Sequence, residues 1–72
     1  MAVATQIGER VRLYRHLRQL SQRELAVAAE IDEATVWRIE NGKVQPSLET
    51  LLRLTDALQT TVENLAQGGP VD

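Results

Sequence analysis

Several residue types that support whole classes of function are scarce in this chain of 72 residues. It has no cysteine, which excludes disulfide bonds and thiolate zinc sites. Its single histidine, His16, belongs to no His/Asp/Glu cluster at metal-ligand spacing, so we expect no metal and no cofactor. No apolar run approaches the roughly 18 residues of a membrane span, and no signal-peptide hydrophobic region follows the start. We expect a soluble, cytoplasmic protein without membrane contact.

Aromatic and catalytic patterns are equally sparse. Tyr14 and Trp37 are the two aromatic residues, too few for stacking single-stranded nucleic acid. The hydroxyl residues Ser21, Ser47 and Thr61 stand where helix caps are expected, and no base lies at a fixed spacing from any of them. We therefore predict no enzymatic activity and no catalytic residue.

The formal net charge of -2 conceals an uneven distribution along the chain. Residues 1–23 contain five arginines and one acid, whereas residues 24–72 contain three basic residues and nine acids. A molecule with such a dipole can meet a polyanion with its basic end. Its overall acidity argues against tight non-specific binding of nucleic acid.

The spacing of apolar residues is helical throughout, and no stretch alternates with the period of two that a strand needs. We predict one compact all-α domain at residues 6–66, between an N-terminal extension at 1–5 and a flexible tail at 67–72. Five helices are expected, over residues 6–18, 21–29, 32–41, 47 to about 58, and a short one after Thr60 or Thr61. The fourth should face the core with Leu48, Leu51, Thr55 and Leu58, widened by Leu52 and Leu54.

Start and stop signals support this division. Ser21 and Glu24 form the S-x-x-E capping box, in which two free helix amides are satisfied reciprocally. Asp32 and Ser47 are expected to cap the third and fourth helices. Gly42 suits the left-handed conformation that ends a helix.

The connection between the second and third helices is very short, because only Glu30 and Ile31 lie within it. Such a link forces two helices to cross steeply, which is the helix-turn-helix arrangement. The outward residues of its second helix can enter the major groove of DNA.

Four stretches carry a resemblance to a known family: residues 7–12 (IGERVR), 20–26 (LSQRELA), 35–43 (TVWRIENGK) and 46–52 (PSLETLL). With this mutual spacing, residues 7–66 resemble the lambda-repressor-like, Cro/XRE-type helix-turn-helix domains. The resemblance implies a compact five-helix fold and sequence-specific binding of double-stranded DNA, commonly as a homodimer. We therefore expect a transcriptional regulator of the repressor type, with residues 32–41 as the recognition helix.

The resemblance also implies site residues. Gln22 matches a position that touches phosphate and the outer base of a half-site, and Arg18 matches a basic phosphate contact. The full set of expected DNA contacts is Arg18, Ser21, Gln22, Glu33, Ala34, Trp37, Arg38, Asn41 and Lys43. For a dimer we expect a surface on the fifth helix and the loop before it, formed by Leu52, Leu58, Val62, Leu65 and Ala66.

The sequence departs from the family pattern at several positions. Glu30 and Gln19 stand where the family usually has glycine, and we predict a left-handed or otherwise strained conformation for Glu30. The carboxylates of Asp32 and Glu33 would repel phosphates, although Glu33 could accept a hydrogen bond from a cytosine amino group.

Four positions that are generally polar in the family are apolar here: Leu13, Leu17, Val27 and Trp37. They support an alternative function, a protein-interaction module (antitoxin-like or an adaptor) that keeps the fold without tight DNA binding. The potential around the third helix distinguishes the two functions.

Overall fold

The computed structural model describes the backbone of residues 3–67 and the side chains of residues 6–66, and within these bounds it contains helices and no strand. The helices are α1 (Val3–Leu17), α2 (Gln22–Ala29), α3 (Glu33–Glu40), α4 (Leu48–Leu58) and α5 (Val62–Gln67). The predicted all-α, five-helix fold is confirmed. The N-terminal extension was placed too far along the chain, because α1 already begins at Val3. Of the expected flexible tail, Gln67 belongs to α5, and residues 68–72 lie outside the described part.

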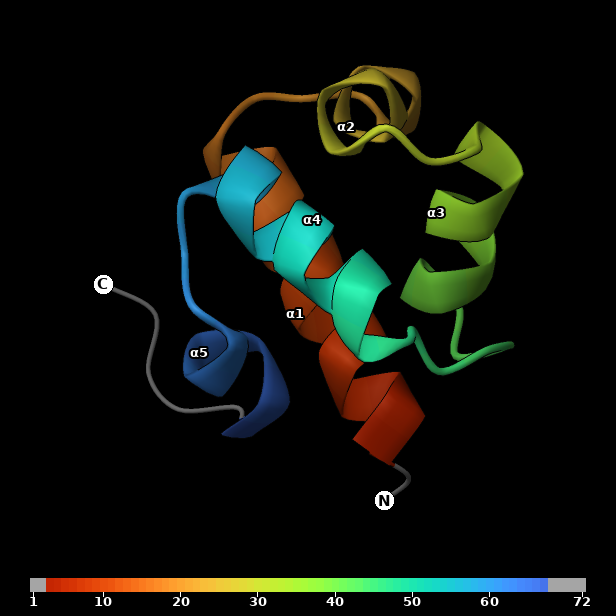
Figure 1. Ribbon diagram of the computed structural model, residues 1–72, viewed down its shortest axis with the longest axis vertical. Coiled ribbons are helices and arrows are strands. Elements are labelled where there is room, and N and C mark those ends of the chain that lie inside the picture. Colours follow the sequence, from red (N-terminus) through yellow and green to blue (C-terminus); the bar gives the residue numbers. More distant parts are fainter. Residues whose placement is uncertain (1–2, 68–72) are drawn as a thin grey trace.

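The helices surround one core. In Figure 1, α1 and α4 cross the middle of the molecule, with α2 above them, α3 on the right and α5 at the lower left. Helix α1 contacts α3, α4 and α5, and α2 contacts α3 and α4. None of the described helices has the length and apolar character needed to cross a membrane. The helix-turn-helix pair of α2 and α3 thus lies at one side of the molecule, with its outer surface uncovered (Figure 1).

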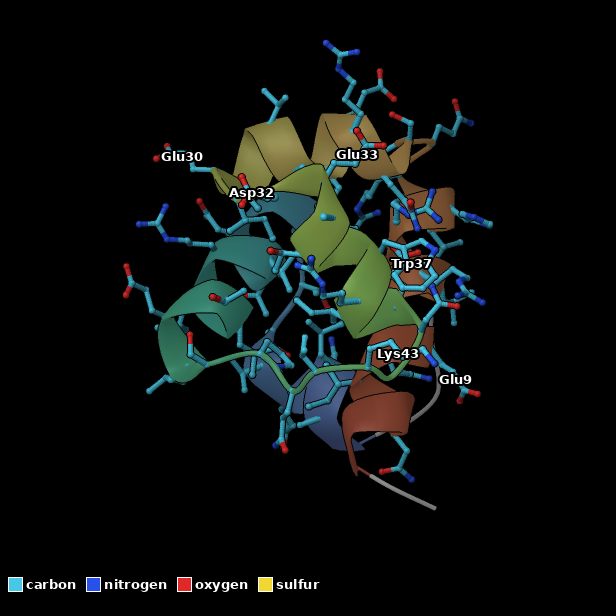
Figure 2. All side chains as sticks on the ribbon, turned by 90° about the vertical axis from the view of Figure 1, so that its right-hand side faces the viewer. Glu9, Glu30, Asp32, Glu33, Trp37 and Lys43 are labelled. Carbon is cyan, nitrogen blue, oxygen red and sulfur yellow. The ribbon has the colours of Figure 1, made fainter. Side chains whose placement is uncertain are left out.

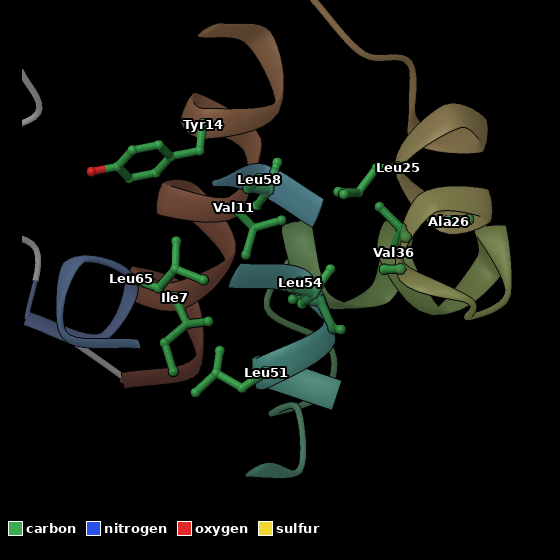
Figure 3. Close-up of a cluster of buried hydrophobic side chains, with 12 residues drawn as sticks. Ile7, Val11, Tyr14, Leu25, Ala26, Val36, Leu51, Leu54, Leu58 and Leu65 are labelled. Carbon is green, nitrogen blue, oxygen red and sulfur yellow. The ribbon is translucent and has the colours of Figure 1, made fainter. Parts of the chain in front are cut away.

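The core draws apolar side chains from all five helices, as Figure 3 shows. Val11, Leu25, Val36, Leu54 and Leu65 have no exposed surface. Each such side chain contributes roughly 1.5–3 kcal/mol when it is fully buried. The core therefore includes α5, through the fully buried Leu65, as well as the central helices.

The predicted core face of α4 is correct in part. Leu51, Leu54, Thr55 and Leu58 are buried, whereas Leu48 is 67% exposed and Leu52 is 51% exposed. Leu48 and Leu52 lie one turn apart on a side of α4 that none of the other described helices covers, and this leaves an apolar strip open to solvent.

The caps follow the sequence closely, with one exception. Ser21 Oγ accepts from Glu24 N, and Glu24 Oε1 accepts from Ser21 N, which completes the predicted capping box. Ser47 caps α4, and Thr61 Oγ1 accepts from Asn64 N at the start of α5. Asp32 is the N-cap residue of α3, as predicted, and has the extended backbone of that position, but its side chain makes no capping hydrogen bond.

Three helices end in a left-handed residue that is not glycine. These residues are Gln19 (φ 58°), Glu30 (φ 59°) and Gln59 (φ 57°). The predicted conformation of Glu30 is thereby confirmed, as is that of Gly42 (φ 69°). A left-handed residue with a side chain costs roughly 1–2 kcal/mol, so the connections of this domain hold strain that glycine would relieve.

Gly8 sets the distance between α1 and α3. A Cβ atom at this position would lie 2.1 Å from the carbonyl oxygen of Ile39 and 3.0 Å from that of Glu40. Both of these atoms are backbone, which cannot rotate away. The missing side chain therefore lets the last turn of α3 lie directly against α1.

Candidate nucleic-acid interface

The outer side of α3 is uncovered along its length. Val36, Ile39 and Glu40 point into the molecule and are buried, whereas Glu33, Ala34 and Arg38 are exposed, and Trp37 is 48% exposed. Figure 2 looks at this side: Glu33, Trp37 and Lys43 follow one another from the start of α3 into the loop after it. The structure thus brings the predicted contact residues of α3 and its following loop onto one surface.

The turn between α2 and α3 fixes this exposure. Glu30 N donates to Val27 O at 3.2 Å, and Ile31 N donates to Ala26 O at 3.0 Å, so α2 closes with a left-handed end before the chain reverses. Leu25 and Ala26 of α2 and Val36 of α3 then pack into the shared core. This packing buries the inner faces of α2 and α3, so α3 presents its opposite face to solvent.

A buried carboxylate joins α1, α2 and α3 behind that face. Arg15 donates to Glu40 through Nε at 2.6 Å and Nη2 at 3.0 Å, and Arg15 Nη1 donates to Leu20 O at 2.9 Å. Gln22 Nε2 donates to Glu40 Oε1 at 3.0 Å, and Arg12 Nε lies 3.5 Å from the same oxygen. The Glu40 side chain has no exposed surface. The end of α3 is therefore fixed to α1 by hydrogen bonds from the charged Arg15 and to α2 by a hydrogen bond from the neutral amide of Gln22.

Burial and the surrounding hydrogen-bond donors have opposite effects on the pKa of the Glu40 carboxyl. Burial alone raises the pKa, because it disfavours the charged form. The hydrogen bonds from Arg15 and Gln22 and the charges of Arg15 and Arg12 outweigh burial and bring the pKa below its ordinary value of 4.5. Glu40 is therefore an ionised carboxylate at neutral pH and acts as a hydrogen-bond acceptor alone.

The side chain of Arg18, a predicted DNA contact, also has a role within the fold. Its Nε donates to Leu58 O at 2.8 Å and its Nη2 donates to Gln59 O at 3.1 Å, at the carboxyl end of α4. A guanidinium is favourable there because the last carbonyls of a helix lack intrahelical partners. Arg18 therefore caps α4, and a phosphate contact would have to share its guanidinium with these carbonyls.

Most of the basic side chains serve the fold. Within residues 6–66, hydrogen bonds or ion pairs engage five of the eight: Arg10, Arg12, Arg15, Arg18 and Arg53. No such partner within this range is found for the side chains of Arg23, Arg38 and Lys43, all of which are exposed. These three side chains are free to reach a phosphate backbone without breaking a contact within residues 6–66, and Arg23 was not among the predicted contacts.

Two of the predicted contact residues, Asn41 and Ser21, form hydrogen bonds that stabilise the helix ends beside this surface. Asn41 Nδ2 donates to Trp37 O at 2.9 Å, and Asn41 Oδ1 lies 3.5 Å from Arg12 Nη2. The hydroxyl and amide of Ser21 are both used in the capping box. Their side chains therefore hold the ends of α3 and α2, beside the surface that α3 presents.

Acidic residues border the start of α3. Glu30 and Asp32 lie toward the α4 edge of the face seen in Figure 2, and Glu33 lies above Trp37. Arg53 reaches Glu30 at 3.4 Å and Glu49 at 3.1 Å. Carboxylates thus border the start of α3, and the exposed basic side chains without a partner in residues 6–66 are Arg38, Lys43 and Arg23.

The predicted dimer surface needs correction at two positions. Leu58 and Leu65 have no exposed surface and belong to the core, so they are not available to a partner. Leu52 is 51% exposed, and Val62 and Ala66 are partly exposed. A hollow beside α4 adds Leu48 to this set, since Leu48, Leu52 and Thr60 are among the residues that line it.

The four residues of the alternative function are all exposed to solvent, from Leu13 at 40% to Val27 at 72%. They come from three different helices: Leu13 and Leu17 lie on α1, Val27 on α2 and Trp37 on α3.

The Glu40 cluster escaped sequence reasoning, although a signal for it was present. Arg15 follows the core residue Val11 by four positions, and Glu40 follows Val36 by four. This spacing places each charge on the inward face of its helix. Two opposite charges at inward positions indicate a buried pair.

Comparisons with known proteins agree with this geometry. A family model described as a helix-turn-helix domain matches residues 6–67. The HTH-type transcriptional regulator DdrOP3 of Deinococcus deserti is 38% identical over 60 residues, which are 83% of this chain and 46% of that protein. The HTH-type transcriptional regulator RghRB of Bacillus subtilis is 39% identical over 59 residues, 81% of this chain and 42% of that protein. The chain thus spans less than half the length of these relatives.

Solved structures show the same arrangement. The restriction-modification controller protein C.AhdI from Aeromonas hydrophila superposes with a TM-score of 0.83 and 32% identity over 86% of this chain and 94% of that one. The P22 c2 repressor, solved in complex with a synthetic operator, superposes with a TM-score of 0.83 and 28% identity over 88% of this chain and 96% of that one. The chain belongs to the helix-turn-helix domain family and has the lambda-repressor-like fold of its DNA-binding transcriptional regulators.

Proposed function

We propose that this domain binds double-stranded DNA as the recognition module of a repressor-type transcriptional regulator in the cytoplasm. The observation that carries the proposal is the uncovered outer side of α3, backed by a rigid helix-turn-helix core. A helix of this kind fits the major groove, where base edges display distinct patterns of donors and acceptors. The names of the relatives, and the operator bound to the P22 c2 repressor, support the same function.

Within this proposal the surface residues divide into two groups. Glu33, Ala34, Trp37 and Arg38 lie where base edges would be read, with the Arg38 guanidinium able to fork onto a guanine. Lys43 and Arg23, at the flanks of α3 and on α2, would contact phosphates and fix the register.

Salt dependence of DNA binding tests the proposal. Three free cations per protomer predict that log K falls by roughly 2.7 per unit of log salt for each protomer bound, at about 0.9 for each neutralised phosphate. Binding to a duplex enriched from a random pool is measured by fluorescence anisotropy from low to high salt. Lys43→Ala should reduce this slope by about 1 unit. Arg53→Ala is the matched control, because Arg53 is engaged with Glu30 and Glu49.

An affinity that does not change with salt concentration would contradict the DNA function. It would favour the protein-interaction module, with Leu13, Leu17, Val27 or Trp37 as the contact. The proposal of DNA binding would also be rejected if the protein enriched no sequence from the random pool.

We further propose a two-fold homodimer formed through the exposed part of α4 and α5. Leu48 and Leu52 give this surface an apolar centre, and Val62 and Ala66 are partly exposed. Two protomers would then present their α3 helices one turn of DNA apart, roughly 34–36 Å. Sedimentation equilibrium tests this arrangement with Leu52→Asp, which should dissociate the dimer. Leu17→Asp is the control, because Leu17 is equally exposed at 50% but lies on α1.

A further inference from the structure

Helix α1 has a second face, on the side turned away from α3. Its members stand at positions i, i+3, i+4 and i+7, the spacing of one face of a helix: Arg10, Leu13, Tyr14 and Leu17. Gly8, which lies against α3, is on the opposite side of the helix. Leu13 and Leu17 are 40% and 50% exposed, so this face, called here the outer face of α1, presents apolar surface to solvent.

Arg10 stands at the N-terminal end of the outer face, beside the end of α5. Its Nε donates to Asn64 O at 3.2 Å, and its guanidinium lies 5.9 Å from the centroid of the Tyr14 ring. The Asn64 carbonyl is among the last four of α5, which lack partners within the helix. Helix α5 ends at Gln67, three residues later, so the chain leaves it less than one helical turn beyond the carbonyl that Arg10 binds.

One nitrogen of this guanidinium lacks an acceptor. Arg10 Nη2 is enclosed and has no hydrogen-bond partner among the described residues, and it is the one buried side-chain atom of residues 6–66 in that condition. An enclosed donor without a partner is costly, and more so when its group is charged. Arg18 shows the satisfied arrangement, because its Nε and Nη2 each donate to a carbonyl where the chain leaves α4. The described residues supply Arg10 with half of such an arrangement.

The residues that follow α5 carry the groups that match the outer face. Residues 68–72 read GGPVD, which provides one apolar side chain, Val71, and one carboxylate, Asp72. The two glycines allow the chain to reverse, since glycine adopts backbone conformations closed to other residues. Five extended residues reach roughly 17 Å, whereas Arg10 and Leu17 are about 10 Å apart along the helix axis. The segment is therefore long enough to lie along the whole face.

We propose that residues 68–72 fold back along the outer face of α1, with Val71 against its two leucines and the Asp72 carboxylate accepting a hydrogen bond from Arg10 Nη2. The segment then satisfies the enclosed donor and covers the exposed apolar surface together. The two leucines become contacts within the chain, which removes two of the four residues that support the alternative function. The inference is independent of the proposed DNA function, because the outer face points away from α3.

Methyl–methyl NOE spectroscopy of the 72-residue protein tests the placement. With methyl groups of valine and leucine labelled with ¹³C, we expect cross-peaks from Val71 to Leu13 and Leu17. Val27, which is 72% exposed on α2, is the control valine and should give no cross-peak to either leucine. A sample mixed from labelled and unlabelled protein separates contacts within one chain from contacts between chains.

A double-mutant cycle tests the hydrogen bond. Asp72→Asn keeps the shape of the side chain and removes its charge, so it should raise the equilibrium constant for unfolding up to about tenfold, the equivalent of about 1.4 kcal/mol. In the Arg10→Gln background the same change should have no effect. Glu63→Gln is the matched control, because Glu63 is an exposed acid of α5 with no ion pair within residues 6–66, and it should leave unfolding unchanged in both backgrounds. If Arg10→Gln does not fold, the methyl spectra of the wild type and of Asp72→Asn decide, since loss of the carboxylate should weaken the Val71 cross-peaks.

Three results would overturn the inference. The first is the absence of cross-peaks between Val71 and the leucines of α1. The second is an equal effect of Asp72→Asn with and without Arg10, which would place the carboxylate elsewhere. The third is a set of cross-peaks that arises only between chains, which would assign the outer face to a second copy of the protein. Asp72→Asn should bind the enriched duplex like the wild type, so none of these results bears on the proposed DNA function.

Discussion

Replacement of Glu30 by glycine should stabilise the domain. Glu30 ends α2 with φ 59° and ψ 45°, a left-handed conformation that costs a residue with a side chain roughly 1–2 kcal/mol. Glycine avoids that cost and adds about 0.5–1 kcal/mol of backbone entropy to the unfolded chain. The ion pair with Arg53 spans 3.4 Å, and the Glu30 side chain is 81% exposed, so its loss matters little. We expect a net gain of about 0.5–1 kcal/mol, which raises the Tm by roughly 2–8 °C.

Thermal and urea unfolding of the wild type, Glu30→Ala and Glu30→Gly, followed by circular dichroism, measures this gain. Glu30→Ala is the control because it removes the ion pair with Arg53 and keeps the strained backbone. The difference between the glycine and alanine variants then isolates the conformational term. A glycine variant no more stable than the alanine variant would refute the reasoning and mean that the left-handed conformation of Glu30 stores no strain.

Three other predictions follow from the described contacts. Gly8→Ala should lower the free energy of unfolding by about 1–3 kcal/mol in urea, because the new methyl group meets the Ile39 carbonyl; unchanged stability would mean that α3 moves away freely. Glu40 should make stability depend on pH: since folding lowers its pKa below 4.5, its contribution is present above 4.5 and is lost as the pH falls through the folded pKa. Glu40→Gln should therefore be less stable at pH 7, by about 3–5 kcal/mol, and lose less on acidification; parallel acid profiles for both proteins would contradict this. Trp37 emission should change when the enriched duplex is added, and Trp37→Ala should lose affinity for a subset of bases; equal losses on all duplexes would place the ring outside base recognition.

Local signals in the sequence predicted the elements well. The capping box at Ser21, the helix end at Gly42 and the left-handed Glu30 depend on residues close in the chain, and the structure confirms all three. The outward face of α3 was also predictable, since Val36 and Ile39 fix which side is buried.

Contacts between distant residues could not be predicted in the same way. Arg18 lies 40 residues from Leu58, and nothing in the spacing of either indicates that a guanidinium will cap α4. A leucine can belong either to an exposed dimer surface or to the core, so the residue type alone does not show where Leu58 and Leu65 lie. Their burial depends on where α5 packs. Asp32 has the residue type of a cap without the hydrogen bond, because residue type does not determine a side-chain rotamer.

The use of five arginines by the fold has a consequence for behaviour in a cell. Attraction to random DNA depends on the cations that a protein can offer, and within residues 6–66 three basic side chains of this domain, Arg23, Arg38 and Lys43, are free of such contacts. A genome presents roughly 10⁶–10⁹ non-specific sites that compete for each molecule. A regulator with little free positive charge spends less time on those sites, so a larger share of its copies is available to the operator. Occupancy of the operator would then follow the number of protein molecules made, with little dependence on the amount of chromosome present.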